Sequence, residues 1–221
     1  VNQLTPVQRL KNALNAESVQ EQFRNALADS APLFIASLID VYGSDRNLQE
    51  CEPRAVIMEA LKAATLRLPI NKNLGFAYIV PYKNKGKAEP QMQIGYKGLI
   101  QLAMRTGEYR YLNADVVYEG ELKSYDKLTG HLDLSGERKG DKVVGYFAYL
   151  ELLNGFSKAV YWTKEQVIEH AKRFSKSYSS QYSPWQTDFD SMALKTVLRN
   201  LITKWGIMSV EMVQAVDRDI E

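Results

Sequence analysis

Hydrophobic residues recur at helical spacing through the first third of the chain. After Pro53 they fall at i, i+4, i+7 and i+11, which places them on one face of a helix. Pro32 begins another apolar run and Gly43 ends it, as residues at helix ends commonly do. Residues 1–66 are therefore predicted to be helical. The buried stripe of the later helix comprises Ile57, Leu61, Ala64 and Leu68.

The hydrophobic period then changes to two, which is typical of β-strands. Apolar residues alternate over residues 76–82 and return over residues 91–94, with Lys83, Lys85 and Lys87 between the two runs. The pattern predicts a β-hairpin with a long, exposed, cationic tip.

A short amphipathic helix is predicted over residues 96–106, ending at Gly107. Lys97, Gln101 and Arg105 stand four residues apart and form its polar stripe. The stripe expected to be buried comprises Leu99, Leu102, Ala103 and Thr106.

Strand-like segments return at residues 112–121, 143–153 and 156–162. Asn154-Gly155 separates the last two and is a strong signal for a tight hairpin turn. Residues 123–142 carry two glycines and mixed charges, which leaves two alternatives, a long loop or a small extra hairpin.

Two helices are predicted after these strands. Thr163 caps the first, and Gln166 three residues later completes a capping box. A polar loop follows over residues 174–183, and Pro184 begins a long final helix that Gly206 ends. The residues of this helix expected to face the core are Leu194, Val197, Leu198, Leu201 and Trp205.

The order of these elements predicts an α+β fold, with an antiparallel sheet and hairpins packed against helices. No repeat or low-complexity linker interrupts the chain, so we predict one domain over residues 1–221. Within it we distinguish a helical part at 1–66, an α+β core at 67–210 and an acidic tail at 211–221.

Composition narrows the class of protein further. With 45% hydrophobic and 24% charged residues, the chain of 221 residues reads as a soluble globular protein. Neither a membrane-length apolar run nor a signal peptide is evident, and the single Cys51 suits a reducing compartment. We therefore expect a cytoplasmic protein without a membrane partner. Because the chain begins at Val1, we also expect it to be a piece of a longer protein.

Charge is segregated along the chain. Residues 67–111 hold eight Lys or Arg against two Glu, and residues 158–205 hold eight against four acidic residues. The other three segments are each net negative, so the overall charge of +2 conceals two basic regions. Folded onto one surface, these regions would attract a polyanion.

Lys195 and Arg199 stand four residues apart on the predicted final helix. Like charges at this spacing repel slightly, so the pair is favoured when an anion such as a phosphate lies between them. The alternative is two solvated cations on an exposed face.

Gly95-Tyr96-Lys97-Gly98 lies where a strand gives way to a helix. Glycines permit close approach of a ligand, the first turn of a helix offers N–H groups to a phosphate, and Lys97 adds a charge. The alternative is that the glycines only permit a tight turn.

Two further groups invite contact with nucleic acid. One is the hairpin tip, and the alternative interpretation is that the tip is only a solvated loop. The other is a polar loop in which cations alternate with aromatic side chains, as in sites that grip single-stranded bases. The alternative for this second group is that Trp185 and Phe174 anchor the loop onto the core. Its members are Arg173, Lys176, Tyr178, Tyr182 and Trp185.

Signals for catalysis and cofactors are absent from the sequence. His131 and His170 lack metal-ligand spacing, and one cysteine excludes the usual zinc sites. The chain has no Gly-x-x-x-x-Gly-Lys-Ser/Thr motif. We therefore expect no cofactor, no metal and no catalytic residue. An alternative is a Mg²⁺-dependent nuclease that uses Asp188 and Asp190.

Three segments together resemble the RecT family of phage and prophage single-strand annealing proteins, relatives of the lambda Red beta protein. The resemblance covers roughly residues 30–210. The segments are Leu66-Arg-Leu-Pro-Ile-Asn71 with Tyr78-Ile-Val-Pro-Tyr82, then Gln93-Ile-Gly-Tyr-Lys-Gly-Leu-Ile-Gln-Leu-Ala103, and finally Ser183-Pro-Trp185 with Met192-Ala-Leu-Lys-Thr196.

The resemblance implies a protein that is not an enzyme. Such proteins coat single-stranded DNA and pair it with a complementary strand in homologous recombination, without nucleotide hydrolysis, as rings or helical filaments. The implied partners are single-stranded DNA, the annealed duplex intermediate, further copies of the chain, and a phage exonuclease or single-strand-binding protein. The family's C-terminal segment for protein contacts is not found in the sequence, so the last two partners stay open.

We therefore expect the two basic regions to line one groove that holds phosphates and leaves base edges exposed. The predicted contacts are Lys83, Lys85, Lys87, Gln93, Tyr96, Lys97, Gln101, Arg105, Arg173, Lys176, Tyr182, Trp185, Lys195 and Arg199. Besides the nuclease, the alternative is a structural scaffold whose basic patches meet acidic patches of neighbouring copies.

Overall fold

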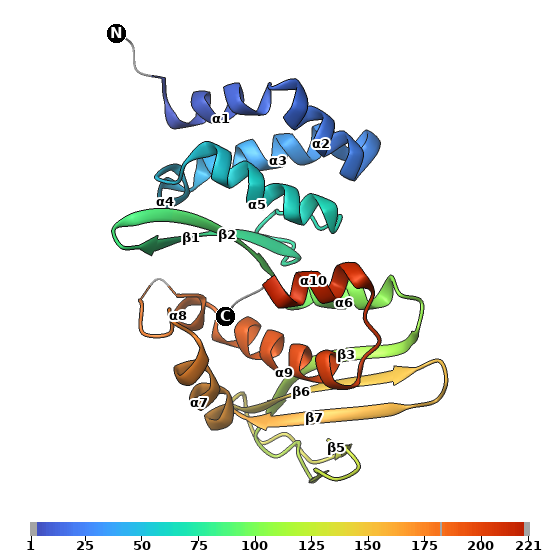
Figure 1. The fold of residues 1–221 in the computed structure, drawn as a ribbon. Helices are drawn as coiled ribbons and strands as arrows, with labels where there is room; N and C mark the ends of the chain where they lie inside the picture. The colour runs from blue at the N-terminus through green and yellow to red at the C-terminus, as the bar shows by residue number, and fades with distance from the viewer. Residues whose placement is uncertain (1–3, 182, 219–221) are drawn as a thin grey trace. The chain divides into compact units, whose positions relative to one another are not determined.

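The computed structural model describes residues 4–181 and 183–218 of the chain (Figure 1). The chain divides into two compact units. The first runs up to Gly98 and takes in residues 215–218, and the second is Leu99–Gln214. The predicted α+β class is confirmed. That the whole chain forms a single domain stays a prediction.

The first unit begins with the predicted helices. The Thr5 hydroxyl and the Gln8 amide form a capping box that fixes the start of the first helix, where Pro6 takes the first helical position. Pro53 likewise begins the last helix of this series, and the Glu52 carboxylate accepts the Ala55 N–H at 3.1 Å. The elements are α1 (Pro6–Leu14), α2 (Glu17–Leu27), a short 3₁₀ turn (Ala28–Ser30), α3 (Ala31–Ser44), α4 (Arg46–Gln49) and α5 (Pro53–Thr65).

These helices enclose a small apolar core of their own. Leu10, Leu14, Phe23 and Leu38 are all within 1% of complete burial. The stretch Glu17–Ser44 is long and apolar enough to span a membrane by composition alone, although the sequence analysis found no such run. Its helical path is broken at Ala28, where φ is 48°, and it contributes to the core on both sides of the break.

The predicted hairpin is present but differs at its tip. β1 (Ala77–Asn84) and β2 (Lys87–Ile94) pair without interruption from Ala77 opposite Ile94 to Asn84 opposite Lys87. Only Lys85 and Gly86 form the turn, and both have positive φ, as a two-residue hairpin turn of type I′ requires. The tip is exposed and cationic as predicted, but it is shorter than predicted, because the strands continue through Lys83 and Lys87.

The hairpin packs against α5 within the first unit (Figure 1). The Glu59 carboxylate on α5 accepts the backbone N–H of Met92 at 2.7 Å and the Lys62 ammonium at 2.5 Å. Helix α6 (Tyr96–Met104) follows β2, and its Leu99, Leu102 and Ala103 are buried as predicted. Thr106 lies beyond the end of this helix and is half-buried.

The second unit is built on a three-stranded antiparallel sheet in the order β3-β6-β7. Its strands are β3 (Tyr109–Tyr118), β6 (Val143–Leu152) and β7 (Ser157–Thr163), and Gly155 makes the predicted turn with φ 88°. A separate hairpin of β4 (Ser124–Asp126) and β5 (His131–Asp133) fills the region for which the sequence left two alternatives.

Helices cover one face of this sheet. α9 (Phe189–Trp205) contacts all three strands (Figure 1), and the alternate β6 residues Tyr146, Ala148 and Leu150 point toward it with no exposed surface. α7 (Lys164–Phe174) begins with the predicted capping box and packs on β6 and β7. The smaller β4–β5 hairpin contacts β7.

The end of the chain differs from the prediction in three ways. The final helix is interrupted at Asp188, which separates α8 (Pro184–Thr187) from α9. Trp205 is 45% exposed at the end of α9 and is not a core residue, whereas Leu194, Val197, Leu198 and Leu201 are buried as expected. The predicted acidic tail contains a further helix, α10 (Val210–Arg218), whose Met212 is buried.

Candidate nucleic-acid interface

The predicted contact residues fall in both units. Those in the first unit are Lys83, Lys85, Lys87, Gln93, Tyr96 and Lys97, and those in the second are Gln101, Arg105, Arg173, Lys176, Trp185, Lys195 and Arg199. Tyr182 lies outside the described residues. That the two sets line one groove stays a prediction, and each set has a clear geometry within its own unit.

The hairpin of β1 and β2, which we call the finger, presents cations in several directions. Lys83, Lys85 and Lys87 are all exposed. Lys83 lies opposite Ala88 and Lys87 lies opposite Asn84, so the two lysines belong to neighbouring cross-strand pairs. Because side chains alternate between the two faces along a strand, these two lysines lie on opposite faces of the hairpin. Lys85 occupies the turn itself. The finger therefore carries charge on both faces and at its tip, and not on one side.

Gln93 supports the finger and does not reach its surface. The side chain is 7% exposed, and its amide nitrogen donates to the Tyr82 hydroxyl at 2.5 Å. A buried amide with a satisfied donor is a structural element of the hairpin. Gln93 is thus positioned to hold Tyr82 and not to meet a ligand.

The two glycines at the junction of β2 and α6 serve close backbone packing. A Cβ atom on Gly95 would lie 2.2 Å from the Gly75 carbonyl oxygen, and one on Gly98 would lie 2.1 Å from the Phe76 carbonyl oxygen. The alternative reading of these glycines is therefore sufficient to explain them. Lys97 between them remains exposed, with its ammonium 6.0 Å from the ring centroid of the half-buried Tyr96.

Gln101 and Arg105 continue the polar stripe of α6. Gln101 is half-buried, and Arg105 is exposed just beyond the end of the helix, where its backbone N–H donates to the Gln101 carbonyl at 3.2 Å. Together with Lys97 they stand at successive turns, as the sequence predicts.

Lys195 is not on an exposed face of α9. Its side chain is 3% exposed, and every residue from Ala193 to Leu198 is buried. The sequence pattern predicts that Lys195 lies on an exposed face of the helix. Four-residue spacing shows which residues share a face, but it does not show how much of the helix surface other elements cover. A buried ammonium requires polar partners, so Lys195 belongs to the interior of the structure. Arg199, one turn further on, is half-buried.

Trp185 anchors its loop, as the alternative reading proposed. It is 2% exposed, with its ring centroid 5.5 Å from that of Phe189 and 6.2 Å from that of Tyr178. The Gln186 amide donates to the Tyr178 carbonyl at 2.7 Å and fastens the loop further. A nucleobase cannot stack on a ring enclosed in this way, so the prediction that Trp185 contacts bases needs correction. Arg173 and Lys176 are exposed.

The exposure of Phe174 was not foreseen, because the alternative reading made this residue a second anchor of the loop. Phe174, the last residue of α7, is 52% exposed and packs against His170 one turn earlier. The only signal in the sequence is the i, i+4 spacing of two rings next to Arg173.

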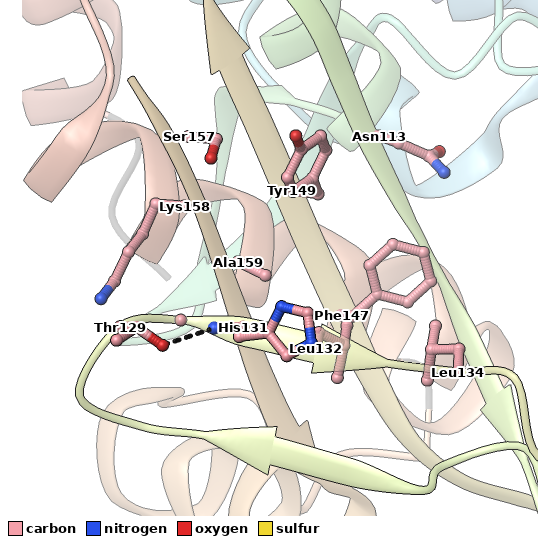
Figure 2. A pocket seen from close by; sticks show the side chains of 11 residues that line it. Asn113, Thr129, His131, Leu132, Leu134, Phe147, Tyr149, Ser157, Lys158 and Ala159 are labelled. Atoms are coloured by element: carbon pink, nitrogen blue, oxygen red, sulfur yellow. Dashed lines mark hydrogen bonds between the residues drawn. The ribbon is translucent and has the colours of Figure 1, made fainter. Parts of the chain in front are cut away.

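An open cavity of about 520 Å³ lies on the sheet face that α9 does not cover. Figure 2 shows Phe147 and Tyr149 projecting from β6 into it, with His131 of β5 alongside. Asn113 and Ser157 line it from the two edge strands. No pattern in the sequence indicates this cavity, because its formation depends on where the β4–β5 hairpin folds back.

Asp188 and Asp190 both have local structural partners. Asp188 caps α9 by accepting the Ser191 N–H at 3.4 Å, and Asp190 accepts the Tyr146 hydroxyl at 2.5 Å. Burial, together with this bond to Asp190, raises the pKa of Tyr146. Among residues 4–181 and 183–218, no group of three or more His, Cys, Asp or Glu side chains is arranged to hold a metal ion.

Comparisons with known proteins agree with the resemblance seen in the sequence. A profile of the RecT family matches residues 33–220. A Bacillus subtilis (strain 168) protein named "Uncharacterized protein YqaK" is 48% identical, over 98% of this chain and 75% of its own length. The Escherichia coli (strain K12) protein named "Protein RecT" is 33% identical, over 78% of this chain and 65% of its own length.

Proposed function

Because the chain belongs to the RecT family, we propose that it binds single-stranded DNA and anneals it to a complementary strand during homologous recombination. The observation that carries this proposal is the family match over residues 33–220, which takes in both units and every predicted contact residue. Membership supports a role in recombination and annealing in general terms.

Phosphates are held by the exposed cations. In the first unit these are the lysines of the finger and Lys97, and in the second they are Arg105, Arg173 and Lys176. Contacts of this kind fix the DNA backbone and leave the base edges available for pairing, so binding is independent of the DNA sequence. Affinity then falls steeply as salt rises, because each phosphate contact releases a counterion.

Annealing by such a surface needs no ATP. The work is to hold one strand with its bases accessible until a second strand pairs with it, and duplex formation supplies the favourable free energy. Each unit offers few cations, so we propose that head-to-tail assembly of copies extends the groove along DNA into a ring or filament. The corresponding partners are single-stranded DNA, the annealed duplex intermediate and other copies of the chain.

The cell compartment and protein partners follow from the same proposal. Both relatives are bacterial proteins, which favours the cytoplasm of a bacterial host cell. A phage exonuclease or a single-strand-binding protein would supply or protect the single strand. We propose no catalytic role for this chain.

The test is an annealing assay with two complementary labelled oligonucleotides, Mg²⁺ and no nucleotide. We expect annealed product at full strand length, and the variant Lys97→Ala with Arg105→Ala should anneal much more slowly. The matched control is Lys123→Ala with Lys127→Ala, which removes two exposed lysines from the acidic part of the second unit. Shortened strands would support a nuclease. Assembly of the protein to the same extent with and without DNA would support a scaffold.

A further inference from the structure

Three aromatic rings form a row that leads from the sheet to the surface of the second unit. Trp162 lies near the end of β7, and His170 and Phe174 lie on α7. The ring centroids are 5.2 Å apart between Trp162 and His170 and 4.7 Å apart between His170 and Phe174. Trp162 and His170 are half-buried, whereas Phe174 is 52% exposed. The outermost ring is therefore supported from beneath by the other two.

The position of this row is fixed by the start of α7. The Thr163 hydroxyl accepts the Gln166 N–H at 3.2 Å, and the Gln166 side chain accepts the Thr163 N–H at 3.0 Å. Val167 and Ala171 are buried and hold the helix against the sheet. Rings at i and i+4 then share one side of the helix. Phe174 is thus held in place before any ligand arrives, which lowers the entropic cost of binding.

Cations flank the exposed ring in the sequence. Lys172, Arg173 and Lys176 are all exposed, and residues 170–187 contain no acidic residue. The guanidinium carbon of Arg173 lies 5.1 Å from the Phe174 ring centroid. An exposed ring among cations is the combination that binds single-stranded nucleic acid, because the ring stacks on a base while the cations meet the flanking phosphates.

Another exposed aromatic pair in the same unit lacks this setting. Phe156 and Trp205 stack with ring centroids 6.3 Å apart. The nearby Lys158 ammonium, 5.2 Å from the Trp205 ring, already donates to the Leu128 carbonyl at 3.1 Å. Leu153, exposed in the turn beside this pair, adds further apolar surface. Phe156, which is 40% exposed, is a suitable control because Lys158, two residues along the chain, already donates this hydrogen bond.

We propose that Phe174 is a stacking platform for a nucleobase of bound single-stranded DNA, with Arg173 and Lys176 on the adjacent phosphates. This inference rests on the proposed function. In it, Phe174 takes the place of the buried Trp185 as the aromatic contact. Stacking on a ring is indifferent to base identity, so the platform suits a protein that binds without sequence preference.

The test compares Phe174→Ala, Phe174→Leu and Phe174→Trp for binding to an oligonucleotide that contains 2-aminopurine. We expect Phe174→Ala and Phe174→Leu to bind about 5- to 100-fold more weakly, while Phe174→Trp binds as the parent protein does. The salt dependence should stay unchanged in all three, because no charge is removed. Arg173→Ala should lower the slope of log affinity against log salt by about 0.7.

Phe156→Ala is the matched control and should bind normally. Phe174→Leu keeps an apolar side chain against His170, so it separates lost stacking from lost packing. Parent-like binding by Phe174→Ala and Phe174→Leu, with an unchanged 2-aminopurine signal, would overturn the inference and leave the proposed function intact. Failure of the parent protein to bind single strands at all would instead overturn the proposed function.

Discussion

At the scale of residues, the same side-chain type has different roles in different surroundings. Lys97 is exposed at the junction of β2 and α6, whereas Lys195 is buried in α9. Trp185 is enclosed by other rings, whereas Phe174 is presented to solvent. The chemistry of an interface is therefore decided by burial as much as by residue identity.

Gly98 offers a direct test of the backbone packing next to Lys97. The change Gly98→Ala places a Cβ atom 2.1 Å from the Phe76 carbonyl oxygen, so the backbone must shift. We expect it to lower the free energy of unfolding by about 1–3 kcal/mol, as overpacking does. Denaturant unfolding measures the change. Gly140→Ala, which meets no atom within 4 Å, is the control and should change stability little.

Cys51 predicts a pH dependence of stability. Burial, followed by the carboxylates of Glu50 and Asp45, raises the pKa of this thiol from 9.0 to about 11. The folded state therefore holds the thiol proton more tightly than the unfolded state does. This contribution is complete below pH 9.0 and is lost as the pH rises toward about 11.

Unfolding measured at a series of pH values, with Cys51→Ala for comparison, isolates this effect. The free energy of unfolding of the parent protein should fall more steeply between pH 9 and 11 than that of the variant. Parallel curves would show that the thiol titrates alike in the folded and unfolded states.

At the scale of elements, local signals were good predictors. The capping box at Thr163, the Asn154-Gly155 turn and the helical start at Pro53 all occur where the sequence indicated. Each depends on residues within a few positions, so the sequence contains the relevant information. The burial of Lys195 and the exposure of Trp205 depend on what covers α9 from elsewhere in the chain. Spacing along a helix cannot reveal that.

The finger gives a prediction at this scale. Lys83 and Lys87 lie on opposite faces of the hairpin, so the two should contact different phosphates or different strands. Each single change to Ala should therefore lower the salt slope of single-strand binding by about 0.7, and the double change by about twice that. Oligonucleotide titrations at several salt concentrations provide the measurement. A double variant no different from either single variant would indicate one shared contact.

At the scale of the whole molecule, the chain leaves its first compact unit at Gly98 and returns to it at Ala215. The second unit is thus inserted between two segments of the first. That the two units together form one domain stays a prediction. The cavity beneath the β4–β5 hairpin and the row of rings on α7 both belong to the inserted unit.

We predict that residues 1–221 unfold in one cooperative transition. Differential scanning calorimetry should give a calorimetric enthalpy equal to the van't Hoff enthalpy. Two resolved transitions would show instead that the two units fold independently as separate domains.

We propose that exposed cations on both units hold single-stranded DNA for pairing without nucleotide. The most direct measurement is the rate at which two complementary, fluorescently labelled strands anneal in buffer free of nucleotide, at low and at high salt. The account predicts a large acceleration at low salt that fades as salt rises and is reduced by Lys97→Ala with Arg105→Ala. An annealing rate that the protein does not change, or an acceleration that is insensitive to salt, would contradict it.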